Sequence, residues 1–127
     1  MILLTANEII TLHRKLTAKS GGSAGLRDLG LLQSAVDSVY AGFGDIELYP
    51  TAAEKAARLA YSLISNHAFV DGNKRIGVFA LLVTARLNNI PLSVTDSDLI
   101  TLGLKTAAGE WKYSDILHWV RSNQVGQ

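Results

Sequence analysis

Apolar residues recur at intervals of three and four along most of the chain, which is the spacing of helices that bury one side. Two of these segments begin with a capping box, in which a threonine and a glutamate three positions later satisfy each other's backbone N–H groups. The two pairs are Thr5 with Glu8 and Thr51 with Glu54, and Thr95-x-x-Asp98 signals a further helix start. Asp28 can cap another helix, and Ser114 or a neighbour begins the last one.

The segment 73–89 is apolar nearly all round, so we expect it to form a buried central helix. Breaks fall at the glycine-rich stretch 19–25 and at "AGFGDIELYP", 41–50, and "IPLSV", 90–94, is extended enough for a short strand. The pattern therefore predicts an all-α fold, a bundle of about six helices in a single domain, 1–127, with a loop directly before the central helix.

Composition narrows the class of protein. The 127 residues fit one domain, and the net charge of +1 argues against direct nucleic-acid binding, which needs a broad positive field. The apolar start "MILLTANEII" lacks the features of a signal peptide, and no run approaches the roughly 18 apolar residues of a membrane span. Cysteine is absent, which excludes thiolate metal sites and fits a reducing cytoplasm. We therefore expect a cytoplasmic protein that does not enter a membrane.

The nine residues "HAFVDGNKR", 67–75, place several reactive side chains at the start of the predicted central helix. The first N–H groups of a helix lack internal partners and carry partial positive charge, so they can bind an anion. Lys74 and Arg75 are unfavourable for helix stability at this end, unless an anion binds there. Asp71 can hold a magnesium ion, and His67 can accept the proton of an attacking hydroxyl. A "DGN" turn alone is common, but the whole combination favours an active site over a solvated turn.

This stretch resembles the His-x-Phe-x-(Asp/Glu)-Gly-Asn-x-Arg motif of the Fic/Doc family. Together with the "GG..GLRD" loop, 21–28, it is most similar to the Doc ("death on curing") branch, the toxins of toxin–antitoxin pairs. The resemblance implies a Fic-type helical bundle in which His67 is the catalytic base and Asp71 holds Mg²⁺. It implies phosphate binding, with side-chain help from the asparagine and the lysine, at Gly72, Asn73, Lys74 and Arg75.

At two positions the chain differs from the commoner, AMP-transferring Fic pattern, and at both it is similar to Doc. Lys74 replaces a second glycine, and Val78 stands where a second arginine would bind phosphate. The resemblance thus implies a kinase that uses ATP and Mg²⁺ to phosphorylate a threonine of elongation factor Tu and so arrests translation. Gly72 is closer to ordinary Fic proteins, which keeps AMP transfer to a protein hydroxyl as an alternative.

The resemblance also implies a partner, a cognate Phd-like antitoxin peptide whose helix lies in a groove of this protein. Thr106-x-x-x-Glu110 is faintly similar to the inhibitory motif of self-restrained Fic proteins, but Trp111 stands where glycine or asparagine belongs. A further alternative is a catalytically idle module that only binds an antitoxin. We interpret His13 and His118 as ordinary helix residues.

Overall fold

A computed structural model describes residues 1–126 and confirms the all-α prediction. Within that range the chain forms six α-helices, one 3₁₀ turn, η1 (Ser38–Tyr40), and one hairpin of two short strands, β1 (Gly42–Phe43) and β2 (Ile46–Glu47). The helices are α1 (Ala6–Ser20), α2 (Leu29–Asp37), α3 (Ala52–Asn66), α4 (Asn73–Leu87), α5 (Asp96–Ala107) and α6 (Tyr113–Asn123). None of these helices has the length and apolarity needed to cross a bilayer.

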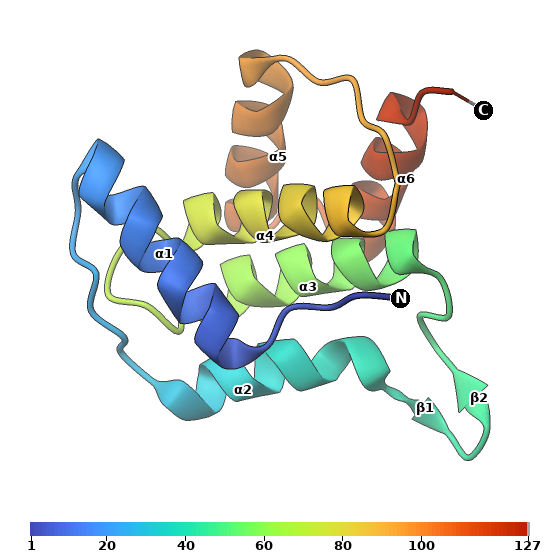
Figure 1. Ribbon diagram of the computed structural model, residues 1–127, viewed down its shortest axis with the longest axis horizontal. Coiled ribbons are helices and arrows are strands. Elements are labelled where there is room, and N and C mark those ends of the chain that lie inside the picture. The colour runs from blue at the N-terminus through green and yellow to red at the C-terminus, as the bar shows by residue number, and fades with distance from the viewer. Residues whose placement is uncertain (127) are drawn as a thin grey trace.

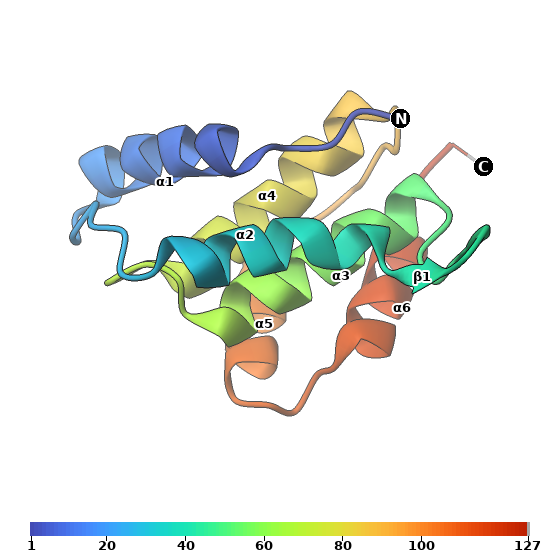
Figure 2. The ribbon, with the colours of Figure 1, turned by 90° about the horizontal axis from the view of Figure 1, so that it is seen from below.

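The centre of the bundle is the antiparallel pair α3 and α4, with α1 and α2 on one side and α5 and α6 on the other (Figure 1). Figure 2 shows the molecule from below, with α2 in front of the central pair and α1 above it in the view. A side chain at Gly77 of α4 would place its Cβ only 2.4 Å from Ile64 Cγ1 of α3. Glycine at this position therefore allows the two central helices to approach closely.

The burial of α4 agrees with its prediction as a central helix, but α3 is buried more completely. Phe79 and Leu87 of α4 remain 36% and 40% exposed. On α3, the small side chains of Ala56, Ala57 and Ala60 are fully buried, and they let neighbours pack on more than one side of that helix.

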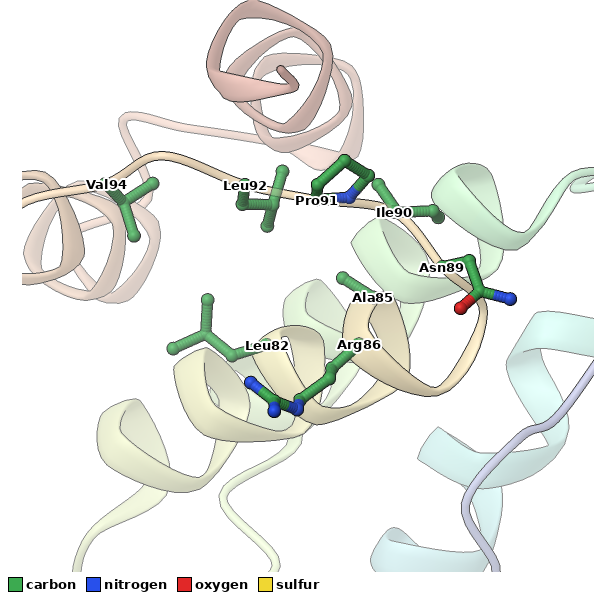
Figure 3. A pocket seen from close by; sticks show the side chains of 8 residues that line it. All are labelled: Leu82, Ala85, Arg86, Asn89, Ile90, Pro91, Leu92 and Val94. Atoms are coloured by element: carbon green, nitrogen blue, oxygen red, sulfur yellow. The ribbon is translucent and has the colours of Figure 1, made fainter. Parts of the chain in front are cut away.

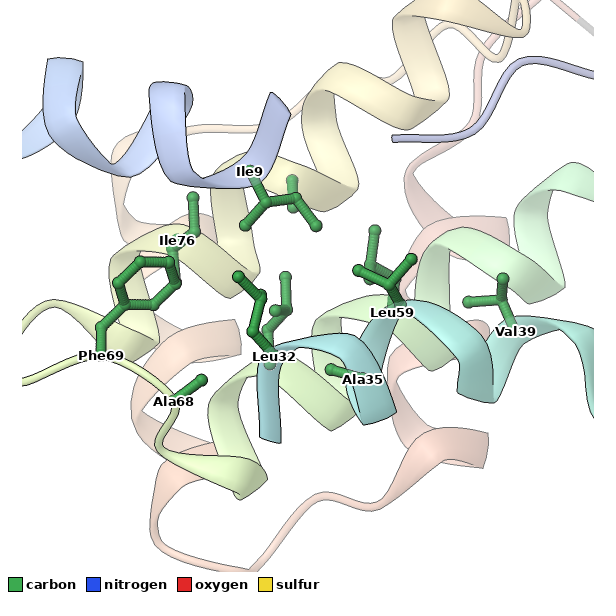
Figure 4. Packing of buried hydrophobic residues seen from close by; sticks show 11 residues of the cluster. Ile9, Leu32, Ala35, Val39, Leu59, Ala68, Phe69 and Ile76 are labelled. Carbon is green, nitrogen blue, oxygen red and sulfur yellow. The ribbon is translucent and has the colours of Figure 1, made fainter. Parts of the chain in front are cut away.

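Two groups of buried side chains lie on the two sides of the central pair. The N-terminal core joins α1, α2, α3 and α4 with the loop between α3 and α4 (Figure 4). It consists of Ile9, Leu32, Ala35, Val36, Val39, Leu59, Leu63, Ala68, Phe69, Ile76 and Ala80. The C-terminal core joins α3 and α4 with α5 and α6, and Trp119 is among its buried members.

The predicted starts of the helices are found with small shifts. Both predicted capping boxes form, the predicted helix start at Thr95 has one as well, and Asp28 caps α2 by accepting the N–H of Leu31 at 3.0 Å. The last helix begins at Tyr113, a neighbour of Ser114, as predicted. The Lys112 N–H donates to Asp115 at 2.8 Å, so Asp115 supports the helix start in place of Ser114.

Two short extended segments differ from the predictions. The break at 41–50 contains the β1–β2 hairpin, in which Gly42 pairs with Glu47 and Phe43 with Ile46. Lys55 of α3, 3% exposed, holds this segment because its ammonium donates to the carbonyls of Val39 and Tyr49 and to the Glu47 carboxylate. The extended segment after α4 makes one bridge, Leu92 to Gln124, in place of a strand.

Candidate active site

The motif loop, residues 67–72, joins the end of α3 to the start of α4. His67 ends α3 in the left-handed region, at φ 53° and ψ 49°, and is exposed to solvent. Arg27, in the loop after α1, donates from Nε to the His67 carbonyl at 2.8 Å and from Nη2 to the same oxygen. The imidazole of His67 is thus accessible, while its backbone is held in a conformation that residues other than glycine adopt uncommonly.

The middle of the motif loop pairs with the segment before α2. The Ala68 carbonyl accepts the N–H groups of Arg27 and Asp28 at 2.8 and 3.0 Å, and Val70 donates to the Gly25 carbonyl at 2.9 Å. Phe69 points into the N-terminal core and is 2% exposed, so its side chain anchors the loop (Figure 4). These contacts attach the loop to the rest of the fold by both backbone and side chain.

Asp71 lies at the end of the motif loop and close to the glycine-rich stretch after α1. Its Oδ1 accepts the N–H of Gly72 at 2.8 Å. Its Oδ2 faces Gly22, where a Cβ atom would come within 2.6 Å of that oxygen. Among residues 1–126 there is no cluster of three or more potential metal ligands. A single carboxylate fits magnesium that arrives with a phosphate substrate, because Mg²⁺ usually keeps few protein ligands and binds phosphate oxygens as well.

The start of α4 is open toward solvent. Gly72 precedes it in the left-handed region, at φ 76°, and no side chain caps the helix. In the described part of the chain, the N–H groups of Asn73, Lys74 and Arg75 have no hydrogen-bond acceptor, and the first intrahelical bond runs from Ile76 to the Gly72 carbonyl. Free N–H groups and the helix dipole together make this end a place where an anion binds favourably.

The side chain of the asparagine in the motif holds the motif loop. Asn73 Oδ1 accepts the Phe69 N–H, and Nδ2 donates to the Phe69 carbonyl, each at 3.0 Å. This pair of bonds closes the motif loop onto the helix start and uses one of the two N–H groups of the amide. The expected side-chain help of Asn73 in phosphate binding stays a prediction, and its backbone N–H is available as well.

The two cations of the motif differ in their surroundings. Lys74 is exposed, and the described residues include no salt bridge to it or to Arg75. Arg75 donates from Nη1 to Ser20 Oγ at 2.6 Å and to the Gly21 carbonyl at 3.2 Å, at the end of α1. Val78, one turn into α4, is 5% exposed and apolar.

His13, predicted to be an ordinary helix residue, contacts the motif loop. Its ring is 1% exposed, stacks on Phe69 with centroids 3.8 Å apart, and places Nε2 2.7 Å from the Asp71 carbonyl. Because a carbonyl only accepts, Nε2 carries the proton in this bond. The signal in the sequence was its position four residues after Ile9, on the apolar face of α1. Arg27 and Gly22 were also missed, because their contacts join segments far apart in the chain.

Two cavities lie along α4. A groove of about 240 Å³ begins at Lys74 and Arg75 and continues between α4 and α5 over Val78, Phe79, Leu99, Ile100, Gly103 and Leu104. A larger cavity of about 640 Å³ lies at the opposite end of α4 and is lined by residues 82–94, Arg86 among them (Figure 3). Only the first of the two adjoins the motif.

The comparisons with known proteins agree with this arrangement. The model of the Fic/DOC family matches residues 3–85, which run from before α1 nearly to the end of α4 and include the whole motif. The chain therefore belongs to the Fic/Doc family. It is 42% identical over 73 residues to Toxin Doc of Mycolicibacterium smegmatis, an alignment that covers 58% of this chain and 56% of that protein. The chain thus spans about half the length of this curated relative.

Proposed function

We propose that this chain is the toxin of a toxin–antitoxin pair and that it transfers the γ-phosphoryl group of ATP to a protein threonine. Its proposed target is elongation factor Tu, whose phosphorylation arrests translation. The observation that supports this proposal most is the uncapped start of α4, with two cations in its first turn and an exposed histidine at the other end of the motif loop. The likeness to Toxin Doc supports the toxin assignment.

In the proposed reaction, His67 accepts the proton of the threonine hydroxyl as its oxygen bonds to the γ-phosphorus. The bond between that phosphorus and the oxygen bridging to the β-phosphate breaks, and ADP leaves with the electron pair. The exposed ring of His67 suits a base that must meet a protein substrate. A positioned base contributes about 10²- to 10⁴-fold to the rate.

Phosphoryl transfer depends mostly on orientation and on stabilisation of the charge spread over the phosphate oxygens. The free N–H groups of Asn73, Lys74 and Arg75 and the two side-chain cations supply this stabilisation. Asp71 would hold Mg²⁺, which when bound neutralises phosphate charge. Gly22 leaves room beside Asp71 Oδ2 that any other residue would fill.

The side chains at 74 and 78 favour phosphoryl transfer over AMP transfer. Lys74 occupies the position where a second glycine leaves space for the α-phosphate in AMP-transferring proteins, and Val78 offers no charge to a phosphate. Gly72 supports AMP transfer as the second candidate, because it matches the Gly-Asn step of those proteins.

ATP labelled separately on the γ- and the α-phosphate distinguishes the two reactions. Incubated with elongation factor Tu, the wild-type chain should pass γ-label to a threonine and leave α-label in solution. His67→Ala should lose the transfer, whereas His118→Ala, at an exposed histidine of α6, should keep it. Label only from the α-phosphate would replace phosphoryl transfer with AMP transfer.

Growth measurements test the alternative of an idle binding module. Expression of the wild-type chain alone should stop growth, and expression of folded His67→Ala should not. Equal toxicity of the two chains would remove His67 from the activity and favour the idle module.

We also propose that the antitoxin inserts an amphipathic helix into the groove between α4 and α5. The groove presents Phe79, Ile100 and Leu104, which are 36%, 60% and 53% exposed, and its motif end is basic. An apolar helix face with an acidic end matches both features, and it would cover Lys74 and Arg75.

The short reading frame expected upstream of the gene supplies the antitoxin for a test. Ile100→Asp should weaken its protection against the toxin, because the change puts a charge in the apolar groove. Phe43→Asp, at a 78% exposed apolar residue of the β1–β2 hairpin, is the matched control and should leave protection intact.

A further inference from the structure

We infer that His13 and Arg27 are positioning residues that clamp the motif loop by its backbone carbonyls, one at each end. Arg27 holds the carbonyl of His67, where the loop begins, and His13 holds that of Asp71, where the loop ends. The effect that we expect these two residues to have on turnover rests on the proposed function. Their effect on the conformation of the loop rests on the geometry of the chain alone.

The hydrogen bonds of the Arg27 side chain go mainly to the backbone of His67. Two of its guanidinium N–H groups reach the His67 carbonyl, and Nη2 also lies 3.4 Å from the Asn66 carbonyl. These oxygens end α3, where the helix dipole makes a cation favourable. The Arg27 residue is exposed, so its removal uncovers little apolar surface. Its contacts therefore act mainly on the left-handed turn that presents the imidazole of His67.

His13 holds the other end of the loop from inside the fold. Its ring stacks on Phe69 at an interplanar angle of 13°, and its Nε2–H donates to the Asp71 carbonyl. A Cβ at Gly72 would lie 3.3 Å from Nε2, so the histidine also packs directly against the turn that begins α4. That turn sets the direction of the free N–H groups of α4.

The two side chains come from α1 and from the loop after it, whereas the residues proposed to do chemistry lie between 67 and 75. The contacts inside the motif, such as those of Asn73, are therefore not the only ones that hold its geometry. The two carbonyl contacts help to set the distance between the imidazole of His67 and the anion-binding start of α4, in the way that supporting residues hold catalytic groups in other sites.

Amide hydrogen exchange of the full chain, without nucleotide, tests the clamp independently of activity. In Arg27→Ala, the amides of residues 68–71 should exchange at least about tenfold faster through local opening, while those of 77–85 in α4 stay as in the wild type. Arg27→Lys keeps the charge and should restore part of the protection. Arg86→Ala, at the far end of α4, is the control and should change nothing in the loop.

A pair of substitutions separates the hydrogen bond of His13 from its packing. His13→Phe keeps a ring on Phe69 but loses the N–H, and His13→Gln keeps a donor but loses the stack. If the hydrogen bond clamps the loop, exchange near Gly72 rises more in His13→Phe than in His13→Gln. If the His13 variants do not fold, the Arg27 variants still test the inference, because Arg27 is exposed and its substitution leaves the core intact.

Turnover then shows whether the clamp positions the reacting groups. In Arg27→Ala we expect kcat to fall and the KM for ATP to stay within about twofold, because Arg27 contacts the His67 end and not the phosphate end. Unchanged exchange in Arg27→Ala overturns the clamp, and faster exchange with unchanged kcat overturns its positioning role. A wild-type chain that transfers neither phosphoryl nor AMP overturns the proposed function, and exchange alone then decides the clamp.

Discussion

The start of α4 differs from the starts of α1, α3 and α5 in every feature that stabilises a helix. Helices α1, α3 and α5 begin with a threonine cap and an acidic residue that completes a capping box. Helix α4 begins after a glycine in the left-handed region, has no side-chain cap, and carries Lys74 and Arg75 in its first turn. Among the six described α-helices, α4 alone lacks both a side-chain cap and an acidic residue in its first turn, which indicates that this helix start serves another purpose.

The end of α3 shows the same departure on the other side of the motif loop. Helix α1 ends at Gly21, with φ 84°, as helices commonly do. Helix α3 ends at His67, which adopts a positive φ without being glycine. Both ends of the motif loop thus give up stability, and strain of this kind gathers at functional sites. The following substitutions test whether the motif loop lowers the stability of the fold while it supports the transfer activity.

The largest effect is expected from His67→Gly. Glycine removes the proposed base, so transfer should fall by about 10²- to 10⁴-fold. Glycine also fits the left-handed turn, so the free energy of unfolding should rise, by about 1 kcal/mol. Labelled ATP and urea unfolding measure the two changes.

Asn89→Gly is the matched control for that experiment. Asn89 also has a positive φ, 57°, but it lies beyond the far end of α4. The change there should stabilise the fold by a similar amount and leave transfer intact. Loss of stability in His67→Gly would show that the imidazole itself supports the fold.

Asp71→Asn should have the next largest effect. The amide keeps an oxygen for the Gly72 N–H but loses the negative charge that suits Mg²⁺. ATP binding in the presence of Mg²⁺ should weaken by at least roughly 10- to 100-fold, which is the usual cost of losing a residue that supports a metal site. Calorimetric titration of ATP with and without Mg²⁺ measures this, and an unchanged magnesium dependence would remove Asp71 from the metal site.

Most of the helices could be predicted because their signals are local. Thr51 and Glu54, for example, are three residues apart and determine a helix start wherever the segment lies in the fold. The anion-binding start of α4 was predicted from equally local signals, the expected helix start after Gly72 and the two cations in its first turn.

The contacts that hold the motif loop could not be predicted because they join distant segments. His13 is 58 positions from Asp71 and Arg27 is 40 positions from His67, and no periodicity records such pairs. The bonds of Asn73 to Phe69 are local, but they depend on a loop conformation that residue types alone do not specify. Lys55 was missed because its charge is buried only where the hairpin supplies acceptors.

Thr51→Ala tests one of the helix starts that have a capping box, the start of α3, which we expect to serve stability alone. Thr51 Oγ1 accepts the Glu54 N–H at 3.2 Å, and losing such a cap costs about 1 kcal/mol. Urea unfolding should show this loss, while phosphate binding and transfer stay unchanged. Thr11→Ala, at an exposed threonine inside α1, is the control and should keep or slightly raise stability, since alanine is the better helix former.

The smallest change in stability is expected from Lys74→Glu, which gives α4 the acidic residue that the other helix starts possess. An acid in the first turn interacts favourably with the helix dipole, so the free energy of unfolding should rise by about 0.3–1 kcal/mol at low salt. The same charge repels phosphate from the free N–H groups of Asn73, Lys74 and Arg75. Wild-type protein should therefore melt at a higher temperature when inorganic phosphate is added, through binding to the native state, and Lys74→Glu should not. Lys105→Glu, in the last turn of α5, controls for the change in net charge and should keep the response to phosphate. A phosphate response that survives in Lys74→Glu would show that the anion does not bind at the start of α4. The difference between this helix start and those of α1, α3 and α5 would then need another cause.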